Sequence, residues 1–261
     1  MHRINLDNNL IRTDLLLEQK PSKKNLKKET YKDIKIVTTT SNNHDYTTIY
    51  FDDITDSNSY YNLEKVFINE LSKYIKLKKN DTFLVIGLGN SKSTPDSLGP
   101  LTIDKIIPTK YLFDLGEVEE GYSNVSIYKP DVIGNTGIES ITIIKSIINE
   151  VKPTKVIIID SLKASNIERL TKTIQITNSG INPGSGINNS RGEISKKTIN
   201  REVIAIGIPT VVDIKSLVKD SSKESFIVTP TNIDFVIERL SLLISKSVNT
   251  NLHKNYNRQI Y

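Results

Sequence analysis

The sequence predicts a single α/β domain with a mostly parallel central sheet flanked by helices. Two short apolar runs, residues 83–86 and 156–159, are rich in β-branched side chains and bounded by turn residues, as expected of strands buried on both faces. Before the second run, residues 138–151 repeat isoleucine at helical spacing, which provides the crossover between parallel strands. A length of 261 residues is enough for one sizeable core.

The same two patterns define the remaining elements. Further strands are expected at residues 34–40 and 47–51, which form a hairpin, at 125–128, from 174 onward and at 203–206. Helices are expected at residues 60–75, 96–107, 138–151, 210–217 and 232–246. No internal repeat is present in the sequence, so everything from the first hairpin onward fits one domain.

The composition restricts the possible functional classes. The chain has 35 basic and 30 acidic residues, so no strongly basic surface is indicated and nucleic-acid binding is not expected. It has no cysteine, which excludes disulfides and a cysteine nucleophile and is typical of a reducing cytoplasm. No run has the apolar length of a membrane span, and the first 20 residues lack a signal-peptide core. We therefore expect a cytoplasmic protein without a membrane partner.

The candidate site begins in residues 82–100, TFLVIGLGNSKSTPDSLGP. The two glycines of GLG allow a sharp turn and a close backbone approach after the first core strand. Asp96 follows at or just before the start of a helix, and Asp160 stands directly after the second core strand. Because sites of α/β proteins form at the carboxyl ends of the strands, the two aspartates converge if these strands are neighbours.

The two carboxylates are expected to have opposite surroundings. The helix dipole and free N–H groups favour the charged form of Asp96, whereas desolvation favours the neutral form of Asp160. Such a pair can share one proton, with one group acting as base toward water and the other as acid toward a peptide. The alternative remains that Asp96 is a helix cap and Asp160 a loop anchor.

Other chemistries fit the sequence less well. The three histidines, His2, His44 and His253, lie far from the strand-end loops in the sequence, which leaves neither a nucleophilic triad nor a histidine-ligated zinc site. The GLGNSKS turn lacks the third glycine of the dinucleotide fingerprint and the G-K-[ST] of a phosphate-binding loop. We therefore expect neither a metal nor a cofactor.

The sequence contains, in this order, the runs GLGNSKSTPDSLGP, EEGYSNVSIYKPDVIGNTGIES, IIIDSLKASNIERLTKTIQITNSGINPGSGINNSRGEIS and VIAIGIPTVVD. Together with LIRTDLLLE near the start and IVTPTNIDFVIERLSLLISKSVNTNLHK near the end, they resemble the spore germination proteases of endospore-forming bacteria. The resemblance implies an aspartic endopeptidase that is made as a zymogen and cleaves small acid-soluble spore proteins during germination. It also implies a fold related to the hydrogenase-maturation endopeptidases.

The resemblance places the family's two catalytic aspartates at Asp96, in TPDSLGP, and Asp160, in IIIDS. Its pro-segment cleavage corresponds to the bond between Asp14 and Leu15, which implies a pro-segment at residues 1–14. The lysine-rich stretch that follows predicts a flexible basic linker at 15–33 before a peptidase domain at 34–261. The implied partners are the spore proteins as substrate and further copies of the chain in a homo-oligomer, in the forespore or spore core.

Six more residues are candidates for the substrate cleft. They are Asn90, Thr94, Thr136, Gly137, Glu139 and Ser185. Thr136 and Glu139 also fit a capping box for the helix at 138–151, and Ser185 also fits a mobile loop.

The family usually carries a long insertion where residues 214–226 stand here, so this chain resembles a short form of the family. The alternatives to a peptidase are a catalytically silent relative that binds spore proteins and a metal-reading maturation protease.

Overall fold

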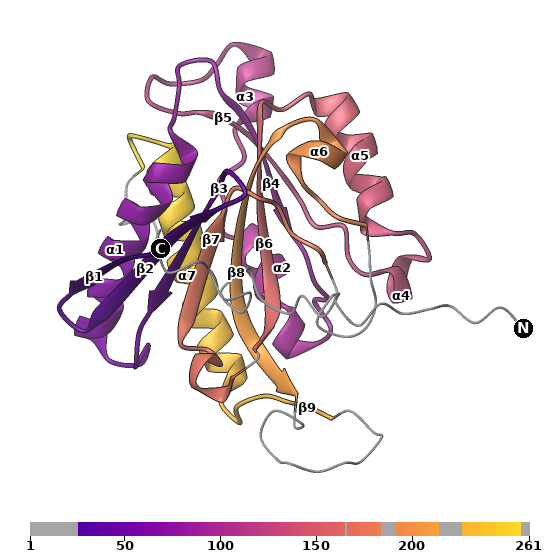
Figure 1. The fold of residues 1–261 in the computed structure, drawn as a ribbon. Helices are drawn as coiled ribbons and strands as arrows, with labels where there is room; N and C mark the ends of the chain where they lie inside the picture. The colour runs from indigo at the N-terminus through magenta and orange to yellow at the C-terminus, as the bar shows by residue number, and fades with distance from the viewer. Residues whose placement is uncertain (1–25, 165, 184–191, 214–225, 257–261) are drawn as a thin grey trace, which may run out of the picture.

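The computed structural model describes residues 26–164, 166–183, 192–213 and 226–256, which form one nine-stranded sheet with helices on both faces (Figure 1). The strands are β1 (Leu26–Tyr31), β2 (Ile34–Ser41), β3 (His44–Tyr50), β4 (Thr82–Gly87), β5 (Asn124–Tyr128), β6 (Lys155–Ala164), β7 (Thr173–Thr177), β8 (Glu202–Asp213) and β9 (Ile227–Val228). The helices are α1 (Ser57–Ile75), η2 (Thr94–Asp96), α2 (Leu98–Ile103), α3 (Lys110–Leu115), α4 (Ile133–Thr136), α5 (Ser140–Val151), η3 (Ile167–Arg169), α6 (Lys196–Ile199) and α7 (Ile233–Leu252).

The sheet has a parallel half and an antiparallel half. The strand order is β1-β2-β3-β7-β8-β6-β4-β5, with β9 paired to β8. β5, β4, β6 and β8 are parallel neighbours, whereas β7, β3, β2 and β1 continue the sheet through antiparallel pairs. Across these pairings β1, β3, β4, β5, β6 and β8 run in one direction. The predicted α/β fold with a mostly parallel sheet is therefore confirmed, and the predicted hairpin belongs to the antiparallel half.

The two faces of the sheet carry different helices (Figure 1). Apolar side chains of α1, α2 and α7 pack on one face, against residues such as Ile157 and Ile206. α5 and α6 cover the other face, to which α5 contributes Ile144 and Ile148. α1 and α7 confirm the helices expected at 60–75 and 232–246. None of the helices in the described ranges has the length and apolarity that a membrane span requires.

β6 and β8 extend well beyond β4. β4 ends at Gly87, opposite Ile159, whereas β6 and β8 remain paired as far as Ala164 and Val212, with a shift in register after Leu162. The helix expected at 210–217 is therefore wrong for residues 210–213, which belong to β8, while 214–217 lie outside the described residues. The β-branched run in PTVVD finds its partner in β6, and a local pattern does not reveal such a distant pairing.

The first strand lies inside the predicted linker. Residues 26–31 form β1 and pair antiparallel with β2, so the expectation of a flexible linker over 15–33 is wrong for these residues. After the first residue, every side chain of β1 is exposed, so backbone pairing holds this edge strand, and its lysines are typical of sheet edges. A lysine-rich exposed strand has the same composition as a solvated linker, which explains the error.

A buried ion pair holds the amino-terminal end of β6. The Lys155 ammonium donates to a carboxylate oxygen of Asp81 (2.7 Å) and to the carbonyls of Ile75 (2.7 Å) and Lys76 (3.1 Å). The two charged side chains are only 4% and 9% exposed. Burial raises the pKa of Asp81, but the hydrogen bonds from Lys155 and the Lys78 N–H, together with the Lys155 charge, outweigh burial and hold the pKa below its ordinary value.

Asp81→Asn should lower stability at neutral pH by about 3 kcal/mol, because it leaves the buried Lys155 charge without its counter-ion. Since the folded pKa of Asp81 lies below its unfolded value of about 4, the stabilisation is present above that value and is lost as the pH falls through the folded pKa. Denaturant unfolding from about pH 7 to about pH 3 should show the gap between wild type and variant closing on the acid side.

The control for this prediction is Asp114→Asn, which breaks an exposed pair with Lys110 and should change stability by less than about 1 kcal/mol at any pH. A gap between wild type and Asp81→Asn that stays constant with pH would contradict the assignment.

Candidate active site

The loop after β4 folds back on itself before α2. The Leu88 N–H donates to the Ile159 carbonyl of β6 (2.8 Å), and the Asn90 N–H donates to the Asp96 carbonyl (3.0 Å). Gly89 lies between these two bonds at φ +120°, and a Cβ there would stand 2.0 Å from the Asp96 carbonyl oxygen. The turn therefore requires glycine at this position, and it returns Asp96 to the end of β4.

Asp96 lies in the 3₁₀ turn η2, immediately before α2. The Ser97 hydroxyl and N–H both donate to the Thr94 carbonyl (2.8 and 3.2 Å), which closes the turn. The prediction that Asp96 precedes a helix is confirmed. α2 ends at Ile103, earlier than expected, because tighter i to i+3 hydrogen bonds follow it.

The first turn of α2 rests directly on the ends of β4 and β6. A Cβ on Gly99 would lie 2.2 Å from the Leu88 carbonyl oxygen and 2.7 Å from that of Ile159. A Cβ on Gly87 would lie 2.3 Å from the Gly99 carbonyl oxygen. These positions face backbone atoms, which cannot move aside as the end of a flexible side chain can. The contact therefore fixes the turn that carries Asp96 against the edge of the sheet.

Asp160 is the first residue of β6 beyond the reach of β4. Its neighbour Ile159 pairs with the last residue of β4, and Asp160 itself pairs with Gly207 of β8. The residue is 6% exposed, and its Oδ1 accepts a hydrogen bond from the Ser161 N–H (2.9 Å). Cα atoms of η2 approach β6 and β8 to within 8 Å. The fold thus brings the segments that carry Asp96 and Asp160 to the same edge of the sheet.

Asn90 connects the site loop to α4. Its side-chain oxygen accepts hydrogen bonds from the Lys92 N–H (2.9 Å) and from the amide nitrogen of Asn135 (3.2 Å). The same nitrogen of Asn135 donates to Asp131 Oδ1 (2.9 Å). Sequence reasoning does not identify Asn135 or Asp131, because Asp131 precedes α4 in the left-handed region at φ +59° and the two residues do not share a helix. A contact of Asn90 with substrate stays a prediction.

The capping box expected at Thr136 and Glu139 is wrong. Thr136 is the last residue of α4, and Gly137 follows in the left-handed region at φ +70°. α5 begins at Ser140, and in the described part of the chain the Glu139 side chain makes no capping hydrogen bond. Gly137 ends α4 before α5 begins. Thr136 and Glu139 therefore belong to the ends of two different helices, whereas their sequence spacing suggests the start of one helix. These three cleft candidates and Thr94 are exposed, and their role in the cleft stays a prediction.

Three further predicted residues, Asp14, Leu15 and Ser185, lie outside the described residues, as does the whole predicted pro-segment. The described chain resumes at Gly192, where a Cβ would stand 3.1 Å from a methyl group of Ile141. Residue 192 therefore lies against the first turn of α5.

His44 and His253, the two histidines in the described ranges, do not form a metal site with the aspartates. Within the described ranges, no group of three or more His, Cys, Asp or Glu side chains is arranged to hold a metal ion. His253 is buried at the end of α7, where Nδ1 accepts a hydrogen bond from the Ser123 N–H (3.3 Å) and Nε2 lies 3.3 Å from the Ile107 carbonyl oxygen. Burial lowers the pKa of His253, so a neutral ring connects α7 to the neighbouring loops.

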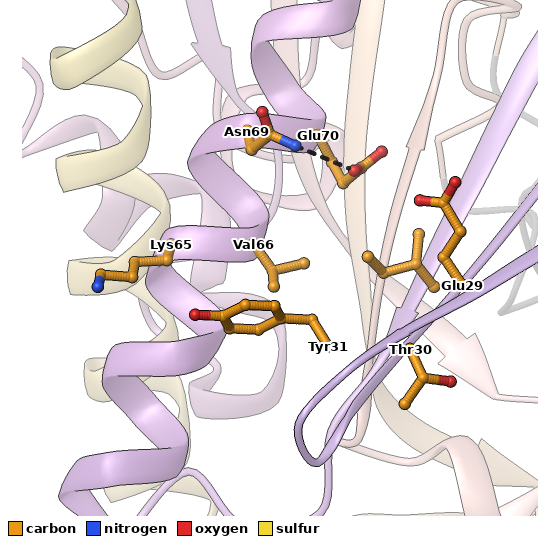
Figure 2. Close-up of a pocket in the computed structure, with 8 residues that line it drawn as sticks. Glu29, Thr30, Tyr31, Lys65, Val66, Asn69 and Glu70 are labelled. Atoms are coloured by element: carbon orange, nitrogen blue, oxygen red, sulfur yellow. Dashed lines mark hydrogen bonds between the residues drawn. The ribbon is translucent and has the colours of Figure 1, made fainter.

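A separate pocket of about 580 Å³ lies between β1, β2 and α1 (Figure 2). Its lining residues are Glu29, Thr30, Tyr31, Ile36, Lys65, Val66, Asn69 and Glu70. Glu70 is 2% exposed and forms an ion pair with Lys73 (2.6 Å). The lining includes neither aspartate nor any other candidate site residue, so this pocket is distinct from the edge of the sheet that carries them.

Comparisons relate the chain to known proteins. A family model described as germination protease matches residues 14–224. A germination protease from Geobacillus sp. (strain WCH70) is 46% identical over 164 residues, which are 61% of this chain and 44% of that protein. One from Bacillus mycoides (strain KBAB4) is 46% identical over 61% of this chain and 45% of its own length. A solved structure, the NiFe hydrogenase maturation protease HycI from Thermococcus kodakarensis KOD1, has a TM-score of 0.40 and 16% identity and covers 69% of this chain and 98% of that chain.

The two aspartate-bearing segments lie at the carboxyl edge of the parallel strands, which is where open α/β sheets carry their ligand sites. The chain belongs to the germination protease family, whose model matches most of its length. It spans less than half of the length of the curated relatives quoted above.

Gly99→Ala should lower the free energy of unfolding by about 2 kcal/mol or more, because the new methyl group overlaps the Leu88 and Ile159 backbone. Gly134→Ala in α4 is the matched control. Among the described residues no atom lies within 4 Å of its added Cβ, so this change should be neutral or stabilise by up to about 1 kcal/mol. Chemical denaturation measures both variants, and equal effects would contradict the packing described here.

Proposed function

We propose that this chain is an aspartic endopeptidase whose catalytic pair is Asp96 and Asp160. The observation that supports the proposal most strongly is the convergence of two segments. The turn that carries Asp96 is packed against the ends of β4 and β6, and Asp160 projects from β6 one residue beyond this contact. Membership of the germination protease family supports peptide-bond hydrolysis in spore germination.

In this mechanism the two carboxyl groups share one proton. The charged carboxylate removes a proton from a water molecule, whose oxygen attacks the carbonyl carbon of the peptide bond. The protonated carboxyl donates a hydrogen bond to the carbonyl oxygen and then supplies the proton that the leaving amine takes up. Because Asp160 is only 6% exposed, little bulk water reaches this side of the pair.

The substrates we propose are small acid-soluble spore proteins, cut after an acidic residue that precedes an apolar one. The bond between Asp14 and Leu15 has the same order, which supports self-processing of a zymogen at this position. The proposal also includes a homo-oligomer in the forespore or spore core. These parts of the proposal rest on resemblance to the family. The chain spans less than half of the length of the two germination proteases compared above.

Asp160→Asn and Asp96→Asn should each reduce kcat for cleavage of a small acid-soluble spore protein by at least about 10²-fold, because each removes one partner of the shared proton. Asp104→Asn is the matched control. Asp104 is an exposed residue at the end of α2 that pairs with Lys129, and its substitution should leave kcat unchanged. Mass spectrometry of the substrate measures cleavage, and circular dichroism verifies the fold of each variant.

The same mass spectra test self-processing. Loss of residues 1–14 from wild type and not from Asp160→Asn would support the zymogen, whereas substrate cleavage without trimming would remove the zymogen from the proposal. Full activity in either aspartate variant would refute the catalytic pair. If folded wild type cleaves nothing, the catalytically silent binding relative becomes the better account.

A further inference from the structure

Gln175, in β7, has a buried polar side chain that lacks a hydrogen-bond partner in the part of the chain that the structure describes. The residue is 1% exposed, and among the described residues neither its amide nitrogen nor its amide oxygen forms a hydrogen bond. A carboxamide offers two N–H donors and an oxygen acceptor, and leaving all of them unmet in the interior destabilises the folded state. An orphaned group of this kind in a native fold calls for a function, a bound water or a ligand.

The sheet places Gln175 level with Asp160. Gln175 pairs with Gly207 of β8, and Gly207 pairs on its other side with Asp160 of β6. Residues that pair directly in adjacent strands point to the same face, so the amide and the carboxylate share one face of the sheet. Two strand spacings separate their Cα atoms by roughly 10 Å, a span that a short extended peptide can bridge.

The residue between them has no side chain. At Gly207 the place of a Cβ is taken by Leu162, whose Cδ1 would stand 2.5 Å from it and whose Cγ would stand 2.8 Å from it. Leu162 is 9% exposed. An apolar side chain therefore occupies the space above Gly207, between the residues that carry the carboxylate and the amide.

We propose that the Gln175 carboxamide binds the main chain of the peptide whose bond is attacked at Asp160. A carboxamide complements a peptide group, because its N–H donates to the peptide carbonyl while its oxygen accepts from the peptide N–H. Leu162 shifts to admit the peptide, and the position of Gln175 on a central strand keeps the amide preorganised. This inference rests on the proposed function and extends it by a substrate-binding residue on the β7 side of the site.

The test uses the full chain and a synthetic peptide of residues 10–19, LIRTDLLLEQ, which contains the Asp14–Leu15 bond. Gln175→Met keeps the length of the side chain and removes its hydrogen-bonding groups. We expect KM for the peptide to rise at least about tenfold with kcat changed little, since uniform binding is lost. The melting temperature should rise or stay equal, because the orphaned amide is gone.

Thr177→Val is the matched control on the same strand and the same face. Its hydroxyl accepts a hydrogen bond from the Ser179 N–H (3.0 Å), so the variant should melt at a lower temperature while KM stays unchanged. Gln175→Leu provides a second variant should Gln175→Met fail to fold. An unchanged KM in a folded Gln175 variant overturns the proposal and assigns the amide to a buried water.

Binding to the Asp160→Asn background separates this inference from the proposed function. Isothermal titration should show that the peptide binds Asp160→Asn and that adding Gln175→Met weakens the affinity at least about tenfold. If wild type does not cleave but these affinities differ as expected, the peptidase proposal fails and the binding residue stands. If the peptide does not bind Asp160→Asn, or binds both variants equally, the role of Gln175 is refuted.

Discussion

The contact between the first turn of α2 and the sheet is the constraint on which the site depends. At Gly87 and Gly99 the helix and the strand ends meet backbone to backbone, and a side chain at either position would overlap main-chain atoms. α7 holds the far end of the same segment, because the Asn249 amide donates to the Lys105 carbonyl (2.9 Å) and accepts from the Ile107 N–H (3.1 Å). The position of the turn that carries Asp96 therefore follows from main-chain packing at the start of α2 and from the hydrogen bonds of the Asn249 side chain beyond its end.

β8 marks the boundary between the two halves of the sheet, since it is parallel to β6 and antiparallel to β7. Asp160 belongs to the parallel half, and Gln175 belongs to the antiparallel half. Gly207 of β8 pairs with both residues, and the Leu162 side chain fills the space where a Gly207 side chain would stand. The antiparallel strands add a polar group on the same face, and the proposed binding of an extended peptide depends on that group.

The sequence predicts the parts of the fold that depend on local signals. Buried β-branched runs identify β4 and β6, and the glycine turn with the strand end leads to Asp96 and Asp160. The errors have a common cause in long-range pairing. The exposed lysines of β1 do not indicate a strand, which forms because residues 26–31 pair with β2. Residues 210–213 continue β8 because β6 runs beside them. Gln175 stands between two isoleucines in TIQIT, and only the assembled sheet shows that it is buried and has no hydrogen-bond partner among the described residues.

The most direct test of the central claim, that Asp96 and Asp160 act as one unit, is the additivity of their substitutions. The measurement is kcat on one small acid-soluble spore protein for wild type, Asp96→Asn, Asp160→Asn and the double variant, with matched circular dichroism spectra. If the two groups share one proton, the double variant should be no slower than the slower single variant, to within about threefold. Losses that multiply in the double variant would contradict a shared catalytic role and would return the two aspartates to separate structural positions.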